Sequence, residues 1–186
     1  QEEKYLDEAI GNLNLVEKHF QFNVLTKIIK NFTTLKNQKL LDVGANTGVF
    51  LASIKDKVKT AQGIEASEEA TIAAQTIHKL DVQSGLIAEV DLPNDNFDII
   101  TMFDVIEHLT DPMNDLNILF QKLKLGGRIF ITTHDIETLL ARLSGRHNPM
   151  LMYQHFYHFS PNTLSRMLQA NGYRIVSTKR FLKSWS

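Results

Sequence analysis

LLDVGANTG, residues 40–48, is the stretch that decides which fold this sequence predicts. The short run over residues 39–43, in which Leu40, Leu41 and Val43 are apolar, is typical of a buried strand in a parallel sheet. A turn with glycines at 44 and 48 follows, and apolar residues 49–51 then begin a helix. A glycine-containing turn between a strand and a helix lets a ligand approach the backbone. We therefore expect an α/β domain with a ligand-binding loop after its first strand.

The rest of the chain repeats this alternation of strands and helices. Hydrophobic periodicity predicts an irregular helical amino-terminal part, followed by a sheet with helices on its faces. Helices are expected to begin after Ser67, Asp111 and Ser160, whose side chains can cap a first turn, and Gly126 is expected to end the second of these. A further helix is expected at 135–143. The expected strands are 39–43, 61–65, 85–90, 97–104, 127–133 and 173–181.

Composition narrows the class of protein. The chain has 186 residues, of which 43% are hydrophobic and 22% charged. This length and composition predict one folded domain. Cysteine is absent, which excludes disulfides, a thiolate nucleophile and a cysteine-based zinc site. The sequence shows no apolar run of membrane-spanning length and no signal-peptide profile at its start. We expect a cytoplasmic protein that is not bound to a membrane.

Charge is distributed unevenly. All 21 Asp and Glu residues lie at or before Glu137, whereas the final 49 residues carry seven Arg or Lys. Such an asymmetry suits an anionic partner for the carboxyl-terminal part, although scattered basic residues more often lie on a solvated surface. Nucleic acid is therefore not favoured as a partner.

Two carboxylates mark the ends of the first two expected strands. Asp42 lies inside the end of the first, and Glu65 ends the second, 23 residues later. A pyrophosphate-binding loop would carry GxGxxG, but here Asn46 lies between the glycines and an acid precedes them. Asp42 suits a ligand ammonium group, and Glu65 lies where α/β cofactor sites accept hydrogen bonds from ribose hydroxyls. The ligand is expected to contain a ribose.

Over Lys39 to Phe181 the chain resembles the class I S-adenosylmethionine-dependent methyltransferases, in particular their small bacterial members. The resemblance rests on LLDVGANTG, GIE at 63–65, DLPNDNFDIITMFDVIEHLTDP at 91–112 and LKLGGRIFITT at 123–133. It implies a Rossmann-like, doubly wound, mostly parallel sheet with strand order 3-2-1-4-5-7-6. The chain stops after its sixth expected strand, so strand 7 is expected to be missing from a trimmed sequence. Residues 1–38 would form a helical lid segment, and residues 39–186 the cofactor-binding methyltransferase domain.

The resemblance also implies a cofactor site for S-adenosylmethionine and its product S-adenosylhomocysteine. Asn46 replaces the usual middle glycine of the loop, and Ala88 stands near the place of an adenine-binding Asp in many relatives. The methionine part would contact the loop and the ribose would contact Glu65. The adenine would contact Ala66 and the end of the third strand, while the last two residues of the fourth expected strand would close the pocket. The implied cofactor-binding residues are Asp42, Gly44, Ala45, Asn46, Gly48, Glu65, Ala66, Ala88, Glu89, Phe103 and Asp104.

Histidines are the candidates for catalysis on the acceptor side. Methyl transfer from a sulfonium is an in-line displacement that depends on positioning and, for oxygen acceptors, on removal of a proton. Histidine is the natural base near neutral pH. His108 follows the fourth expected strand, and His155 and His158 lie in an aromatic segment that can cover the same edge of the sheet.

A metal site is an open alternative at the same place. Asp104, Glu107 and His108 are three and four residues apart, so they would share a helical face, and some methyltransferases hold a divalent ion with a similar spacing. A turn in which Asp104 serves the cofactor needs no ion. The preferred interpretation of the sequence is therefore a site without metal.

Three functions remain open. The first is an enzyme that transfers a methyl group to a small-molecule acceptor, with an anionic or sugar-like acceptor suggested by the basic carboxyl-terminal part. The second is a catalytically silent cofactor-binding or scaffold domain of a larger protein. The third, a nucleotide-dependent dehydrogenase, would require a nicotinamide dinucleotide to bind instead.

Overall fold

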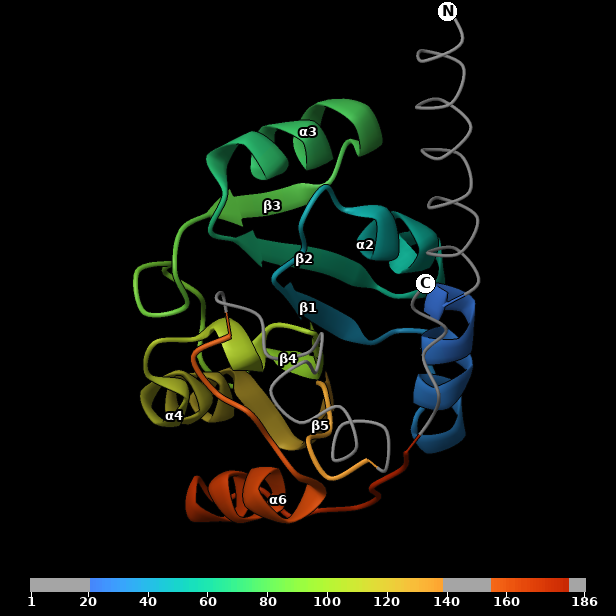
Figure 1. The fold of residues 1–186 in the computed structure, drawn as a ribbon. Coiled ribbons are helices and arrows are strands. Elements are labelled where there is room, and N and C mark those ends of the chain that lie inside the picture. Colours follow the sequence, from blue (N-terminus) through green and yellow to red (C-terminus); the bar gives the residue numbers. More distant parts are fainter. Residues whose placement is uncertain (1–20, 139–154, 181–186) are drawn as a thin grey trace, which may run out of the picture.

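The computed structural model describes residues 21–138 and 155–180. A five-stranded sheet forms its centre, in the order β3-β2-β1-β4-β5, and every neighbouring pair of strands is parallel (Figure 1). The strands are β1 (Lys39–Val43), β2 (Thr60–Glu65), β3 (Asp81–Ser84), β4 (Phe97–Phe103) and β5 (Leu123–Thr132). This confirms the doubly wound fold and the 3-2-1-4-5 part of the expected strand order.

Helices cover both faces of this sheet. They are the helix at 21–32, α2 (Val49–Ile54), α3 (Glu68–His78), α4 (Pro112–Lys122) and α6 (Pro161–Ala170), with short 3-10 turns η1 (Lys55–Lys57) and η2 (Ile106–His108). The predicted caps are confirmed, because the side chains of Ser67, Asp111 and Ser160 each accept a backbone hydrogen bond in the first turn of α3, α4 and α6. No helix in the described ranges is long and apolar enough to cross a membrane.

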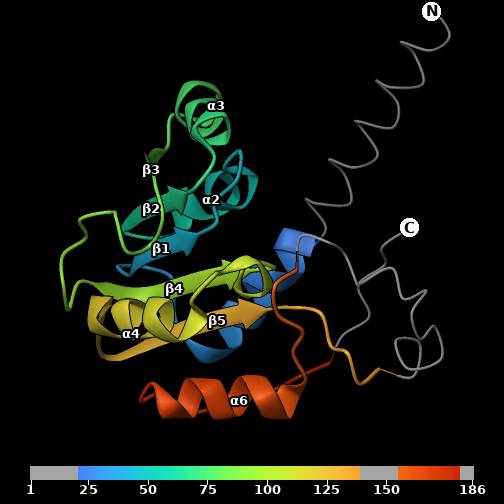
Figure 2. The ribbon, with the colours of Figure 1, turned by 60° about the vertical axis from the view of Figure 1, so that its left-hand side comes forward.

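The alternation of side chains along β1 divides the core in two. Leu41 packs with Leu116 and Leu119 of α4 and Leu168 of α6. Its neighbour Leu40 faces the other way and packs with residues of α2, α3 and the helix at 21–32. Figure 2 shows α4 and α6 beside β4 and β5, with α2 and α3 next to β2 and β3. The sheet therefore has no solvent-facing side at its centre, as its apolar strands predict.

Two predicted strands need correction. The third strand is β3, at Asp81–Ser84, rather than 85–90, and residues 86–89 form a turn instead. β3 is an edge strand in which only Val82 is buried, so it carries little of the apolar signal that marks the inner strands. The expected sixth strand at 173–181 is not a strand over its described part, 173–180, where no neighbouring strand pairs with it.

Two helix boundaries also differ from expectation. α4 ends at Lys122, not at Gly126, and β5 begins at Leu123, so the glycine turn lies within the strand. Asp135 forms an isolated bridge with Phe159, and 136–138 are a turn and bend, where a helix was expected. Residues 139–143 of that expected helix lie outside the described ranges.

Candidate functional site

A cleft of about 600 Å³ opens at the carboxyl ends of β1, β2 and β4. Ligands of open α/β sheets bind at this edge because the loops there diverge. Of the residues that the sequence assigns to the cofactor, eight line the cleft: Asp42, Gly44, Ala45, Asn46, Glu65, Ala66, Phe103 and Asp104. Residues far apart in the sequence are thus brought to one cavity.

The loop after β1 has the backbone geometry that its glycines and Asn46 predict. Gly44 has φ +72°, and a Cβ built on it would lie 2.3 Å from Val105 Cγ2, so no other residue fits without a shift. Asn46, at φ +50°, is also left-handed, a conformation that Asn tolerates better than most residues. The replaced middle glycine therefore leaves the loop intact.

Glu65 holds this loop from the neighbouring strand. Its Oε2 accepts a hydrogen bond from the backbone N–H of Asn46 at 2.8 Å, and its Oε1 accepts one from Ser67 N–H at 2.8 Å. Each carboxylate oxygen has further lone pairs, so these bonds leave Glu65 able to accept hydrogen bonds from a ligand hydroxyl. The carboxylate expected at the ribose is thus fixed in place before any ligand binds.

Asp42 is a buried acid beneath the same loop. Its carboxylate is only 3% exposed and accepts a hydrogen bond from Thr101 Oγ1 at 2.6 Å. Burial raises the pKa of Asp42 to about 7; the Thr101 hydrogen bond opposes this shift, and the negative charge of Glu65 adds to it. A buried carboxylate of this kind gains from a nearby ligand cation, which favours its ionised form.

Three of the assigned residues do not line the cleft. Gly48 instead allows close packing, since a Cβ there would lie 2.4 Å from Leu80 Cδ1 and 3.0 Å from Ala74 Cβ. Ala88 and Glu89 lie within the turn after β3, and the Glu89 carboxylate accepts a hydrogen bond from the backbone N–H of Leu86. Because β3 ends at Ser84, the residues that reach the cleft from this side are Gly85, Leu86 and Ile87.

The far wall of the cleft comes from the end of β4 and from the helix at 21–32. Phe103 packs edge to face against Phe50, with ring centroids 4.9 Å apart, and Phe50 also contacts Phe22. Asp104 has φ +57° and accepts a hydrogen bond from Thr132 Oγ1 of β5. Residues of the amino-terminal helix that line the cleft are Gln21, Phe22, Val24 and Leu25.

The three predicted catalytic histidines gather beside this cleft. The ring centroid of His155 lies 4.8 Å from that of His108 and 6.1 Å from that of His158. Only His108 lines the cleft itself. His134, which sequence reasoning missed, joins them with its ring 5.5 Å from that of His155. Its position just after β5 is the signal that could have identified it, since strand ends meet at this edge.

Glu107 is a buried acid beside these histidines. It is 2% exposed, and neither of its carboxylate oxygens has a hydrogen-bond partner among the described residues. One ligand atom from each of Glu107, His108 and His155 lies within 4.8 Å of the others, which is an arrangement that could hold a metal ion. Asp104, which the sequence groups with Glu107 and His108, is not part of this cluster.

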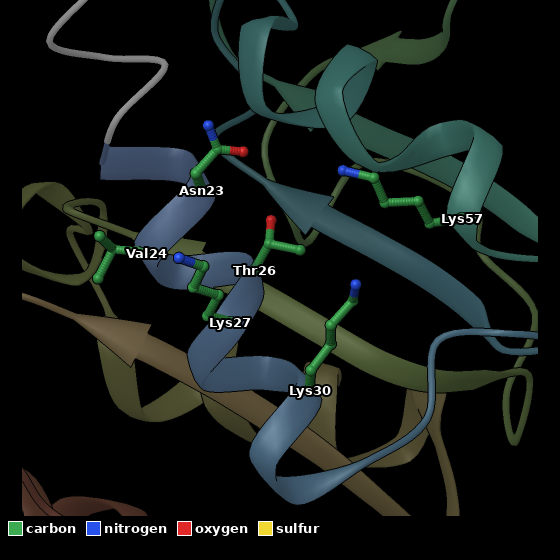
Figure 3. A pocket seen from close by; sticks show the side chains of 6 residues that line it. All are labelled: Asn23, Val24, Thr26, Lys27, Lys30 and Lys57. Carbon is green, nitrogen blue, oxygen red and sulfur yellow. The ribbon is translucent and has the colours of Figure 1, made fainter.

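A second hollow of about 390 Å³ lies on the helix at 21–32 (Figure 3). Lys27 and Lys30 of that helix and Lys57 of η1 surround it, and it shares the lining residue Val24 with the larger cleft. No Asp or Glu is among its described lining residues. The two cavities therefore differ in charge, because no Lys or Arg lines the described part of the larger cleft.

Comparison with known proteins agrees with this geometry. A ubiquinone biosynthesis O-methyltransferase of Pseudomonas fluorescens (strain SBW25) is 29% identical over 109 residues, covering 53% of this chain and 45% of that protein. A tRNA U34 carboxymethyltransferase of Campylobacter fetus is 30% identical over 132 residues, covering 68% and 47%. The chain thus spans about half the length of these curated relatives.

Solved structures show the same fold. A structure of an S-adenosylmethionine-dependent methyltransferase from Thermotoga maritima superposes with a TM-score of 0.69 at 22% identity, covering 86% of this chain and 74% of that one. The family described as "Methyltransferase domain" matches residues 18–178, which include every strand of the sheet and the helix at 21–32. From this match and from the loop and cleft described above, the chain belongs to this family of class I S-adenosylmethionine-dependent methyltransferases.

Proposed function

We propose that this chain transfers a methyl group from S-adenosylmethionine to a small-molecule acceptor. The observation that carries the proposal is the pair of carboxylates, Asp42 and Glu65, which lie at the ends of adjacent strands and line the same cleft. A ligand with a cationic amino-acid end and a ribose matches this pair. The anionic pyrophosphate of a nicotinamide dinucleotide would be repelled by the same two carboxylates.

The cleft suggests where each part of the cofactor lies. The methionine part fits against Asp42 and the loop at Gly44, Ala45 and Asn46, and the ribose fits at Glu65. The adenine fits between Ala66 and the segment at 85–87, so that segment replaces Ala88 and Glu89 in the proposal. Phe103 and Asp104 would close the site, and the helix at 21–32 would serve as part of its lid.

His108, His155 and His158 would form the acceptor side of the site. In the proposed reaction the acceptor atom forms a bond to the methyl carbon as the carbon–sulfur bond breaks, and sulfur keeps the electron pair. A hydroxyl acceptor also gives up its proton. The protein contributes mainly by holding donor and acceptor in line.

A small acceptor without strong negative charge suits the cleft better than a nucleic acid. Binding to an RNA backbone depends on Lys and Arg contacts with phosphates, and no such residue lines the described cleft. Within the basic carboxyl-terminal part, Arg180 forms ion pairs with Asp135 and Glu137, so its own charge offers little support for an anionic acceptor. A hydroxyl-bearing acceptor is therefore our proposal, with a sugar-like compound as one candidate.

Isothermal titration with S-adenosylmethionine and S-adenosylhomocysteine tests the cofactor assignment. We expect both to bind, and Glu65→Ala to weaken binding by about 1–3 kcal/mol, since it removes a charged hydrogen-bond acceptor. Glu89→Ala removes a nearby carboxylate that does not line the cleft, and it should leave the affinity unchanged. Equal affinities for wild type and Glu65→Ala would refute the pocket assignment.

Methyl transfer itself requires a separate assay. The protein would be incubated with methyl-labelled cofactor and either a low-molecular-weight metabolite fraction or total tRNA. We expect label in the metabolite fraction. Label in tRNA alone would contradict a small acceptor, and cofactor binding without transfer to either fraction would favour a silent cofactor-binding scaffold.

A further inference from the structure

The carboxylate of Glu107 is buried and has no hydrogen-bond partner among the described residues, which suggests that it binds a ligand. It lies in η2, just after β4, with 2% of the residue exposed and both oxygens unpaired within the described residues. A buried ionised carboxylate is strongly unfavourable unless a cation or hydrogen-bond donors compensate for its lost hydration. No described Lys or Arg forms an ion pair with it. A bound cation would supply the missing partner.

The imidazoles of His108 and His155 lie near enough to Glu107 to bind the same cation. The ligand atoms of Glu107, His108 and His155 lie within 4.8 Å of one another. Ligand atoms that share a zinc ion lie about 2.0–2.2 Å from it, so they are at most about 4.4 Å apart. The observed limit of 4.8 Å is slightly wider, so the three side chains would draw together around an ion, and His108 is exposed rather than held in the core. The three side chains are therefore close to the geometry of a single metal site.

Backbone hydrogen bonds bring these ligands together without an ion. The N–H groups of Phe156 and Tyr157 donate to the carbonyl oxygen of Glu107 at 2.9 and 3.3 Å, which fixes the chain beside His155. The N–H of His108 donates to the carbonyl oxygen of Val105 at 2.9 Å and forms the turn of η2. The fold thus places three potential ligands, from two distant segments, at one point.

We propose that Glu107, His108 and His155 bind one divalent first-row transition-metal ion. Two imidazoles and one carboxylate suit Zn²⁺, Co²⁺ or Mn²⁺ better than Mg²⁺, which prefers oxygen ligands alone. Three protein ligands leave coordination positions open for water or substrate. The site differs from the grouping suggested by sequence spacing, because His155 takes the place of Asp104.

The position of His108 connects this site to the cleft. It belongs both to the ligand cluster and to the cleft lining, so the ion would border the cofactor cleft. Resting on the proposed methyltransferase function, the open positions would take an oxygen of the acceptor. The acceptor class is then a hydroxylated small molecule able to coordinate a metal, which deepens the assignment made above.

Titration of the metal-depleted protein with Co²⁺ tests the site directly, because bound Co²⁺ absorbs in the visible region. We expect one ion per chain, displaced by an equivalent of Zn²⁺ but not by Mg²⁺ at the same concentration. Loss of a residue that only supports a metal ligand weakens metal binding by about 10–100-fold. His155→Ala and Glu107→Gln each remove a ligand, so each should weaken Co²⁺ binding by more than this. His78→Ala, which removes an α3 histidine outside the cluster, should leave binding unchanged.

The outcomes separate this proposal from the proposed function. No Co²⁺ binding by the wild-type protein, or equal binding by wild type and His155→Ala, would overturn the metal site. Circular dichroism checks that Glu107→Gln folds, and His155→Ala provides the same test at a partly exposed position. S-adenosylmethionine titration of the metal-depleted protein should still show binding, so the cofactor assignment is tested independently of the ion.

Discussion

At the scale of single residues, three buried or half-buried carboxylates are central to the proposed chemistry of this protein. Asp42 is satisfied by Thr101, and Glu65 by two backbone N–H groups, whereas Glu107 has no partner among the described residues. Each lies at the carboxyl end of a strand or just beyond it. Their different environments separate their proposed roles: Asp42 and Glu65 line the cleft and would contact the cofactor, whereas Glu107 lies beside His108 and His155.

The raised pKa of Asp42 predicts how cofactor affinity depends on pH. Since this pKa is about 7 in the free protein, the carboxyl is mostly protonated below pH 7. A cationic ligand favours the ionised form, so binding should release a proton, and affinity should rise by up to about tenfold per pH unit between pH 5 and 7. Calorimetry at pH 6 in buffers of different ionisation enthalpy measures the released proton.

Asp42→Asn is the matched control for this linkage. It keeps a hydrogen-bonding side chain of the same size at a buried position but cannot ionise. We expect weaker cofactor binding and loss of the proton release that Asp42 contributes. Unchanged proton release in Asp42→Asn would assign the linkage to another group.

At the scale of an element, the loop from β1 to α2 depends on its backbone conformation. Gly44→Ala should destabilise the protein by about 2–4 kcal/mol, because it combines a left-handed residue with overpacking against Val105. Gly126→Ala is the control that measures the cost of the left-handed backbone conformation alone, without overpacking. Gly126 has a similar φ of +81° with nothing within 4 Å of a built Cβ, so about 1–2 kcal/mol is expected. Urea denaturation measures both variants, and equal losses would contradict a steric role for Val105.

At the scale of the whole molecule, one sheet joins two separate hydrophobic clusters. Leu40 and Leu41 are adjacent in β1 and fully buried, but they pack on opposite faces. Leu40→Ala and Leu41→Ala should each lower the free energy of unfolding by about 2–5 kcal/mol. Both faces should still unfold in a single transition, because they share the same strands.

Urea denaturation followed by circular dichroism and by hydrogen exchange checks this cooperativity. Leu125→Ala, at a fully exposed position of β5, is the control and should change stability by no more than about 0.5 kcal/mol. If Leu40→Ala produced a second, earlier transition while Leu41→Ala did not, the two faces would be independent units.

The sequence by itself determined the inner part of the fold and the loop at its first strand end. β1 was predicted at its observed bounds, and β2 and β4 to within one residue. Apolar residues dominate β1 and β4, as buried inner strands require, whereas β2 carries a weaker apolar pattern. Asp42, Glu65 and the cleft-lining residues of the loop follow from that register. The caps at Ser67, Asp111 and Ser160 were equally local, since each depends on a side chain and the next few N–H groups.

Only the tertiary structure decided the edge of the sheet and the composition of the histidine cluster. β3 has a single buried residue, so its position depends on pairing with β2 and not on a pattern of its own. The place of Gly85, Leu86 and Ile87 in the cleft follows from that pairing. His155 lies beside Glu107 and His108 because backbone hydrogen bonds join two segments that are more than forty residues apart in the sequence. Local sequence spacing cannot predict this proximity, because it depends on the path by which the chain returns to the sheet.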